Sequence, residues 1–307
     1  MTAQPVSIPP APPGLTDLAE IEVAETPRRR VLRRLLHNKA AVFGLAFLAV
    51  VLVAALFAPW LAPYDPDATS LEINQLPSGA HWLGTDSLGR DILSRLIFGA
   101  RVSIEVCLLV VVFATAVAVP LGLVAGYFRG WSDSVIMRTM DALFAFPALT
   151  LALAVAALLG PSLVNASIAI AIVFIPGFVR LLRAQVLAVR EETFIEASRS
   201  IGTGSSRMLV RHVLPNVSGP LIVQVALSFG YALLAEAGLS FLNFGVQIPT
   251  ASWGTMLQNA YPFILTAPWP LFPPGIAIAL TVLSFNLVGD GLRDALGREV
   301  YTLKVDS

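Results

Sequence analysis

Six long and nearly uncharged apolar runs limit the folds open to this chain more than any other feature. They cover residues 40–62, 102–126, 142–164, 161–179, 217–241 and 271–288, the third and fourth overlapping at their ends. A helix that crosses the hydrocarbon layer of a membrane needs about 20 apolar residues. Only 13% of the residues are charged, against about 25% in a soluble domain. We therefore expect an all-α membrane protein with six transmembrane helices.

The N-terminal region differs from a secretory signal, because residues 1–27 hold six prolines and several acids but no apolar core. We expect a disordered tail over residues 1–37 and a first membrane helix that is retained as an anchor. That helix and an outer segment would occupy residues 38–101. A five-helix core would follow over residues 102–292, and a cytoplasmic tail over residues 293–307.

The positive charges predict the orientation. Six Lys or Arg residues precede the first run, two fall in loop 127–139, six in the segment 180–216 and three after the last run, so 17 of the 20 lie on one side. Cytoplasmic loops are enriched in Lys and Arg, so both termini are expected in the cytoplasm. Loop 242–270 has neither residue and would lie outside, where Trp253, Tyr261 and Trp269 suit a membrane-interface belt.

The longest inner loop between two runs, residues 190–216, contains the stretch ETFIEASRSIGTGSSRMLVRHVLPN. Its pattern predicts a short helix over residues 191–201 whose apolar face carries Phe194, Ile195, Ala197, Ser198 and Ile201. Gly202 is placed to end this helix in a left-handed conformation. Ser205 or Ser206 can cap a second helix, and Pro215 suits the start of the fifth span. Two interpretations stay open from the pattern alone: a linker lying on lipid headgroups, or a docking element for a cytoplasmic partner.

This loop resembles a known motif. EASRSIG, nine further residues and HVLP resemble the EAA loop of the membrane permeases of bacterial ABC importers, with Ser198 and His212 departing from the usual Ala and Ile. Residues 38–66, 81–103 and 235–257 also resemble segments of the dipeptide, oligopeptide and nickel branch, in the same order. The resemblance covers roughly residues 38–297 and is closest to the C-type permease subunit.

The resemblance implies a type I importer permease fold in the bacterial cytoplasmic membrane. A second, B-type permease, two P-loop ATPases (or one fused ATPase) and an extracytoplasmic binding protein would be its partners. ATP and Mg²⁺ would bind to the ATPases, and this chain would hold no cofactor or metal. The loop would dock on an ATPase through Phe194, Ile195, Glu196, Ala197, Ile201, Gly202, Leu214 and Pro215. The substrate would be a dipeptide or oligopeptide, with nickel or another small solute as the alternative.

The sequence offers little for catalysis of its own. It has no G-x-x-x-x-G-K-[ST] phosphate-binding loop, no H-E-x-x-H and no G-x-S-x-G. Its three histidines, His37, His81 and His212, lie outside the apolar runs. A membrane enzyme is therefore disfavoured, and so is an autonomous secondary transporter, because no internal repeat is visible. The net charge of zero gives no reason to expect a nucleic-acid partner.

A few polar residues near the spans are candidates for the translocation path. Arg180 and Arg183 share a helix face, either snorkelling to the interface or lining a wet vestibule. Glu236 is expected to make polar contacts across the permease pair rather than bind substrate. Asp141 would sit favourably at the start of the third span. On the outer segment, Asp86, Arg90, Asp91 and Arg95 are expected to be solvated, with contact to the binding protein as the second alternative. Asp91 and Arg95 are expected to form an i,i+4 pair.

Overall fold

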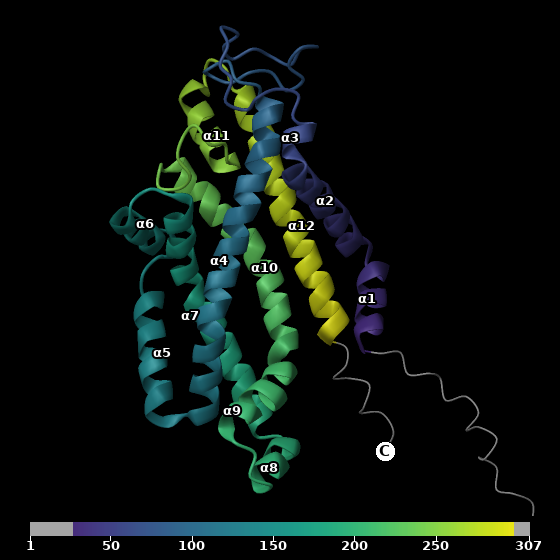
Figure 1. The fold of residues 1–307 in the computed structure, drawn as a ribbon, viewed down its shortest axis with the longest axis vertical. Coiled ribbons are helices and arrows are strands. Elements are labelled where there is room, and N and C mark those ends of the chain that lie inside the picture. The colour runs from purple at the N-terminus through teal and green to yellow at the C-terminus, as the bar shows by residue number, and fades with distance from the viewer. Residues whose placement is uncertain (1–26, 298–307) are drawn as a thin grey trace, which may run out of the picture.

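The computed structural model describes residues 27–297, and this part of the chain is built from helices without a regular strand (Figure 1). In chain order the α-helices are α1 (Pro27–His37), α2 (Lys39–Leu56), α3 (Ala58–Leu61), α4 (Ile92–Phe128), α5 (Gly130–Phe144), α6 (Ala148–Leu159), α7 (Leu163–Arg190), α8 (Thr193–Ser200), α9 (Ser205–Met208), α10 (Leu214–Phe241), α11 (Trp253–Ala260) and α12 (Phe272–Gly297). Shorter turns are the π-helical η2 (Leu209–Val213) and the 3-10 helices η3 (Tyr261–Phe263) and η4 (Trp269–Leu271).

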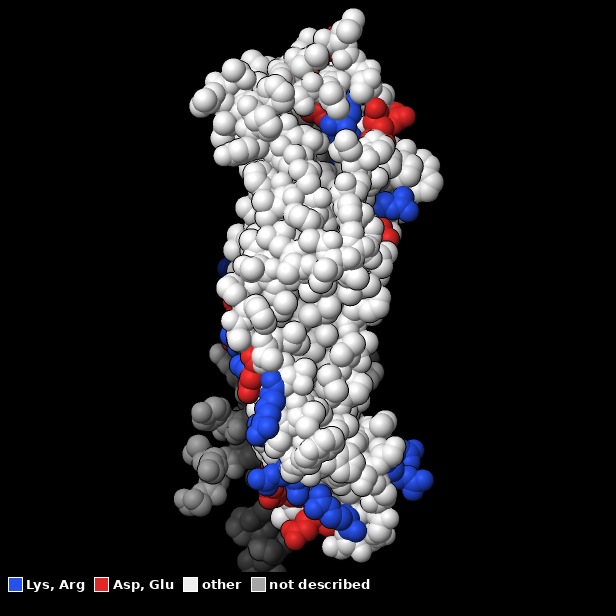
Figure 2. All heavy atoms as spheres, turned by 90° about the vertical axis from the view of Figure 1, so that its left-hand side faces the viewer, with Lys and Arg blue, Asp and Glu red and all other residues white. Residues whose placement is uncertain are grey.

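Within the described residues, five helical stretches are long and apolar enough to cross a membrane. They are Lys39–Leu56, Ile92–Phe128, Leu163–Arg190, Ser205–Phe241 and Trp269–Gly297. A sixth crossing exists if α5 and α6, bent by 94° relative to each other, count as one broken span. Figure 2 shows an uncharged belt across the middle of one face, with the charged side chains gathered toward the two ends. The prediction of an all-α membrane protein is confirmed.

The third span differs from its expected form. Residues 142–164 do not make one straight helix, because α5 ends at Phe144 and α6 begins after Pro147. Proline lacks the N–H that would continue the ladder, and it disfavours helical geometry in the residue before it. Loop 127–139 is also not a loop. Arg129 alone separates α4 from α5, and the turn uses positive φ values at Arg129 (58°) and Gly130 (65°).

The centre of the bundle is the long contact between α4 and α7, with α2 and α10 also packed on α4. Two glycines on α4 allow this approach. A Cβ added at Gly122 would lie 2.6 Å from the Leu182 Cβ, and one added at Gly126 would lie 2.6 Å from the Val186 Cβ. Real Cβ contacts are longer, so these two positions accommodate only a hydrogen and bring the helix backbones together.

The ends of the chain also depart from the sequence analysis. Residues 27–37 form helix α1, where we expected the disordered tail to continue. Residues 293–297 belong to α12 rather than to a C-terminal tail. The remaining tail segments, 1–26 and 298–307, lie outside the described residues. Figure 1 shows α8 and α9 at one end of the molecule, and α3 and α11 at the opposite end.

Candidate coupling elbow and translocation face

Helix α8 ends in a glycine-dependent turn, as its sequence predicts. The N–H of Gly202 donates to the Arg199 carbonyl (3.0 Å) and the N–H of Thr203 donates to the Ser198 carbonyl (3.2 Å). This pair of bonds is the Schellman arrangement, which requires a left-handed residue after the helix. Gly202 supplies it with φ of 80°. A Cβ there would meet no atom within 4 Å, so glycine is required for its backbone conformation rather than for space.

The apolar side chains of α8 point in two directions, which corrects the expected single apolar face. Ile195 is completely buried, in a cluster that includes Tyr127 of α4 and Val186 of α7. Phe194 is 40% exposed and Ile201 is 84% exposed. Ala197, between them on the helix, is also exposed, as is Glu196. Ile195 therefore anchors α8 to the bundle, and Phe194, Ala197 and Ile201 form an exposed apolar stripe.

Two arginines, Arg190 at the end of α7 and Arg199 on α8, contact the end of α4. The Arg199 guanidinium carbon lies 5.5 Å from the centre of the Tyr127 ring, within the range of a cation–π contact. The Arg190 Nη1 donates to the Tyr127 carbonyl at 2.9 Å. Both contacts are made to Tyr127, so the end of α7 and the last turn of α8 are held against the same turn of α4.

The arm after Gly202 runs into the membrane helix without a break. Helix α9 passes through the π turn η2 into α10, and these form one stretch, Ser205–Phe241. The N-cap of α9 is Gly204, with no side-chain cap bond, so the expected cap by Ser205 or Ser206 is wrong. The N–H of Leu214 donates to the Leu209 carbonyl, five residues back, directly before Pro215. In an α-helix a proline ring conflicts with the carbonyl four residues earlier, and the wider π turn lies at this point.

Leu214 and Pro215 differ in their surroundings. Leu214 is partly buried and packs on the cluster that holds Ile195, whereas Pro215 is exposed. We call residues 191–213 the elbow. Its two arms connect directly to the long helices α7 and α10, and its inner side is packed on the bundle.

Arg180 and Arg183, on α7, both pair with carboxylates of α5. Arg183 makes two bonds to Asp133, from Nε to Oδ1 (2.6 Å) and from Nη2 to Oδ2 (2.7 Å). Arg180 binds Asp141 at 2.7 Å and lies over the Phe144 ring, 4.3 Å from its centre. The two-pronged Arg183–Asp133 pair fixes geometry as well as charge. Asp141 lies in the last turn of α5 rather than at the start of a span. Its expected role at a helix N-terminus is therefore wrong.

A cavity of about 440 Å³ opens beside the break between α5 and α6. Its walls come from Phe144 and from α6, α7 and α10, and most of the side chains are apolar. Gln224 and Tyr231 of α10 are the polar side chains on the wall, and Tyr231 is 62% exposed. The cavity therefore has a mostly apolar lining with two hydrogen-bonding side chains, and one of its sides is open.

Glu236 is buried within this chain. Its carboxylate accepts hydrogen bonds from the hydroxyls of Ser240 (2.8 Å) and Ser103 (3.3 Å). The Ser103 hydroxyl in turn accepts the backbone N–H of Trp253 at 3.3 Å. Glu236 therefore links α10, α4 and α11, and the contacts that we expected across a permease pair are instead made inside the chain.

The outer aromatic residues are likewise mostly engaged in the fold. Trp253 is only 2% exposed, and its ring N–H donates to the Leu96 carbonyl at 2.9 Å. The ring N–H of Trp269 donates to the Leu83 carbonyl at 2.7 Å. Of the three expected belt residues, Tyr261 alone is exposed.

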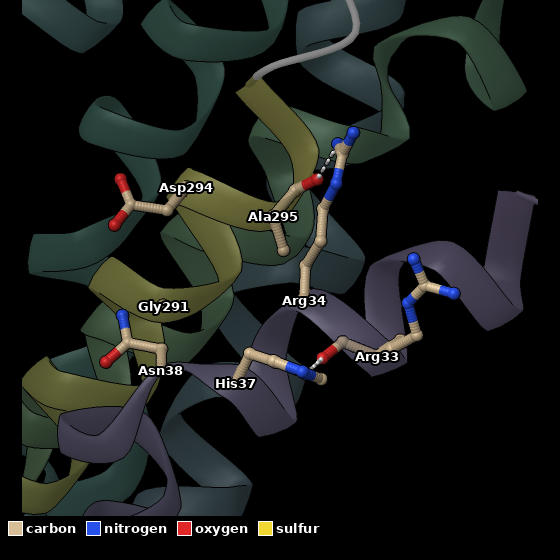
Figure 3. A pocket seen from close by; sticks show the side chains of 7 residues that line it. All are labelled: Arg33, Arg34, His37, Asn38, Gly291, Asp294 and Ala295. Atoms are coloured by element: carbon tan, nitrogen blue, oxygen red, sulfur yellow. Dashed lines mark hydrogen bonds between the residues drawn. The ribbon is translucent and has the colours of Figure 1, made fainter.

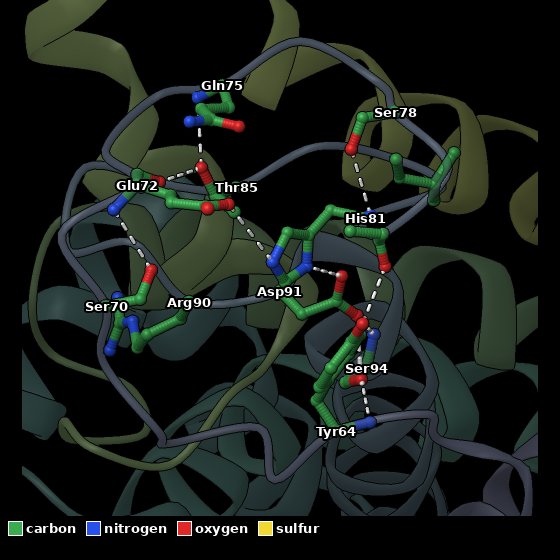
Figure 4. Close-up of polar contacts among 12 residues, drawn as sticks. Tyr64, Ser70, Glu72, Gln75, Ser78, His81, Thr85, Arg90, Asp91 and Ser94 are labelled. Atoms are coloured by element: carbon green, nitrogen blue, oxygen red, sulfur yellow. Dashed lines mark hydrogen bonds and ion pairs between the residues drawn. The ribbon is translucent and has the colours of Figure 1, made fainter.

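The outer segment before α4 is a buried polar network rather than a solvated one (Figure 4). Asp86, Arg90, Asp91 and Arg95 are all at most 9% exposed. The expected Asp91–Arg95 pair is wrong. Asp91 instead caps α4 through the N–H of Ser94 (2.8 Å) and lies 2.9 Å from the His81 Nδ1. Sequence reasoning missed His81, although the density of polar residues in HWLGTDSLGRD is a signal for such a network.

The remaining charged pairs of this segment link its turns together. The Nε of Arg90 binds Asp86 at 2.7 Å, and the Nη1 of Arg95 binds Asp67 at 3.1 Å. Arg95 also donates to the carbonyl of Pro66 at 2.8 Å. These bonds fix the shape of the segment between α3 and α4, which lies at the end of the molecule opposite the elbow.

Two family models match the chain. Residues 118–301 match the family described as binding-protein-dependent transport system inner membrane component, and residues 26–77 match the N-terminal transmembrane domain of oligopeptide transport permease C. The chain is 44% identical to the dipeptide transport system permease protein DppC of Alkalihalophilus pseudofirmus over 298 residues, which are 96% of this chain and 95% of the relative.

Two further relatives carry related names. The di/tripeptide transport system permease protein DppC of Pseudomonas aeruginosa is 46% identical over 281 residues, 89% of this chain and 93% of the relative. The glutathione transport system permease protein GsiD of Pectobacterium atrosepticum is 43% identical over 273 residues, 88% of this chain and 91% of the relative.

Proposed function

The chain belongs to the family of binding-protein-dependent transport system inner membrane components, and on that premise we propose that it is a pore-forming subunit of an ATP-driven importer of dipeptides or short oligopeptides. It is a multi-pass protein of the cytoplasmic membrane. The peptide substrate is supported by relatives whose names specify dipeptides, tripeptides and glutathione, itself a tripeptide. The elbow is the observation that carries the coupling part of the proposal.

The proposal assigns ATP and Mg²⁺ to partner subunits. Members of this family work with a second permease, ATPase subunits and a binding protein. Here we propose an unlike, B-type permease, two P-loop ATPases or one fused ATPase, and an extracytoplasmic binding protein. This chain itself would bind no cofactor and catalyse no hydrolysis, since its sequence has no phosphate-binding loop.

Coupling would pass through the elbow. Phe194, Ala197 and Ile201 would enter a cleft on an ATPase, because an exposed apolar stripe at the tip of a membrane protein is suited to a protein partner. Glu196 would border the contact. Closure of the ATPases would move α8, and Ile195 together with the continuous α9–α10 stretch would pass that motion to α7 and α10.

The substrate path would run along the face that carries the cavity beside α6. A second permease would close its open side, and Gln224 and Tyr231 would offer hydrogen bonds to a passing peptide backbone. Arg180 and Arg183 would act by bracing α5 against α7, and Glu236 by holding α11 in place.

The substrate class can be tested by uptake. We expect proteoliposomes that contain the chain with its co-expressed permease, ATPases and binding protein to accumulate a labelled dipeptide when ATP is enclosed. Nickel should stay outside under the same conditions. Accumulation of nickel without the dipeptide would contradict the peptide assignment and favour the small-solute alternative.

The orientation gives a second test. Cys107 is the single cysteine of the sequence and is replaced by alanine in this test. With both termini and the elbow in the cytoplasm, a membrane-impermeant thiol reagent should label Thr250→Cys in intact cells and Ser206→Cys only after permeabilisation. Both positions are exposed. Ser252, in the same outer loop, is buried as the N-cap of α11 and is unsuitable. Labelling with the opposite sidedness would overturn the orientation.

A further inference from the structure

A cavity of about 450 Å³ lies between α1 and the last turns of α12 (Figure 3). It shares no residue with the elbow or with the cavity beside α6. Its walls are formed by Arg33, Arg34, His37, Asn38, Gly291, Asp294 and Ala295, and we call it the basic pocket. Three of these seven residues have basic side chains, and all three come from α1.

The donors of the basic pocket are held in defined positions. The Nη1 of Arg34 donates to the Ala295 carbonyl at 3.3 Å, which uses one of the five N–H groups of the guanidinium. The Nδ1 of His37 lies 2.9 Å from the Arg33 carbonyl. A carbonyl can only accept, so Nδ1 carries the ring proton in this arrangement. Figure 3 shows the Asp294 carboxylate, the one acid on the wall, directed away from the Arg34 guanidinium.

The basic pocket also lies at the edge of a membrane-crossing helix. Asn38 caps α2, the first candidate span, which begins at the next residue. On α1, Leu32 and Leu36 are exposed by 56% and 54%, one turn apart and next in sequence to Arg33 and His37. A helix with adjacent apolar and basic stripes lies between the headgroups and the hydrocarbon of a bilayer. Leu35, by contrast, is buried and holds α1 against α12 beside Gly291.

We propose that the basic pocket binds the phosphate of an anionic phospholipid. The phosphate oxygens would accept hydrogen bonds from Arg33 and Arg34 beside the His37 ring, and the acyl chains would follow the exposed apolar surface of Leu36 on α1 and Phe43 on α2. Basic pockets between membrane helices are suited to such headgroups.

The test uses the full-length chain in detergent and counts bound lipid by native mass spectrometry, with phosphatidylglycerol and phosphatidylcholine of equal acyl chains as probes. The variant is Arg33→Gln/His37→Gln, which spares the Arg34 bond to Ala295. The matched control is Arg129→Gln/Arg138→Gln, which removes two exposed positive charges near and on α5. We expect phosphatidylglycerol to bind the wild type and the control about tenfold more tightly than it binds the variant.

Comparison of the two lipids on the wild-type chain does not depend on the folding of any variant. Equal binding of phosphatidylcholine would reduce the pocket to an apolar groove and overturn the proposal. Unchanged phosphatidylglycerol binding in a folded Arg33→Gln/His37→Gln variant would also overturn it. Displacement of the lipid by millimolar inorganic phosphate would reassign the pocket to a free anion.

Discussion

Replacement of Ala197 by glutamate should abolish peptide uptake while leaving the chain inserted in the membrane. Ala197 lies on the exposed stripe of α8 between Phe194 and Ile201. If that stripe enters a cleft on an ATPase, a carboxylate at this position would be buried without a partner, which costs several kcal/mol. We therefore expect ATPase binding to weaken by roughly a hundredfold or more, measured as co-purification and as uptake into proteoliposomes.

Two control variants, Ala197→Ser and Gly204→Val, separate effects on docking from effects on folding. Ala197→Ser keeps a small side chain and should retain uptake. Gly202→Val should impair uptake because φ at this position is 80°, where a branched residue costs about 1–2 kcal/mol. Gly204→Val, two residues away at φ of −65°, should be tolerated. Wild-type uptake in both Ala197→Glu and Gly202→Val would return the elbow to a lipid-facing linker and leave the coupling proposal without a site.

The second large effect is expected at the contact between α4 and α7. Gly126→Val would place its Cβ 2.6 Å from the Val186 Cβ and 3.0 Å from the Arg183 carbonyl oxygen, and the backbone atom cannot turn away. In Gly122→Val the added Cβ would likewise lie 2.6 Å from the Leu182 Cβ. We expect each variant to lose about 1–3 kcal/mol of unfolding free energy, measured as a lower midpoint of heat-induced unfolding in detergent.

The matched control for these variants is Gly177→Val on α7. It also adds a branched side chain to the interior of a membrane helix, but its Cβ meets no atom within 4 Å because it faces the cavity beside α6. Its unfolding midpoint should stay close to the wild-type value. A fall as large as that of Gly126→Val would show that glycine loss in general, rather than the close approach of α4 and α7, accounts for the effect. Val186 and Leu182 also support Ile195, so Gly126→Val should reduce coupling as well.

The parts of the fold that depend on local sequence could be predicted. Five apolar runs became helices long enough to cross a membrane. The turn at Gly202 followed from a glycine placed directly after the last apolar residue of a short helix. Both features depend on neighbours within a few residues, so no tertiary information was needed.

Features set by distant contacts could not be predicted in the same way. Ile195 and Phe194 are adjacent and equally apolar, and only the packing of α8 on Tyr127 and Val186 decides which one is buried. The partners of Arg180 and Arg183 lie on α5, where charge counting had assigned Asp133 to a loop and Asp141 had been placed at the start of the third span. Pro147 is a helix-breaking residue, but the continuous apolar run around it favoured the prediction of one unbroken span.

The outer segment shows the same limit for charged residues. Asp86 and Asp91 were expected to be solvated because they stand in a polar stretch, and helical spacing suggested a pair between Asp91 and Arg95. The chain instead folds back before α4, so that Asp91 caps this helix and contacts His81. Burial of this kind is fixed by tertiary packing rather than by the spacing of charges.

The most direct test of the central claim is a measurement of ATP hydrolysis by the purified chain and by the reconstituted complex of permeases, ATPases and binding protein. We predict no hydrolysis by the chain alone. The complex should hydrolyse ATP and accelerate when the binding protein carries a peptide, and that acceleration should disappear with Ala197→Glu in this chain. Hydrolysis by the isolated chain, or acceleration that is unchanged by Ala197→Glu, would contradict the account.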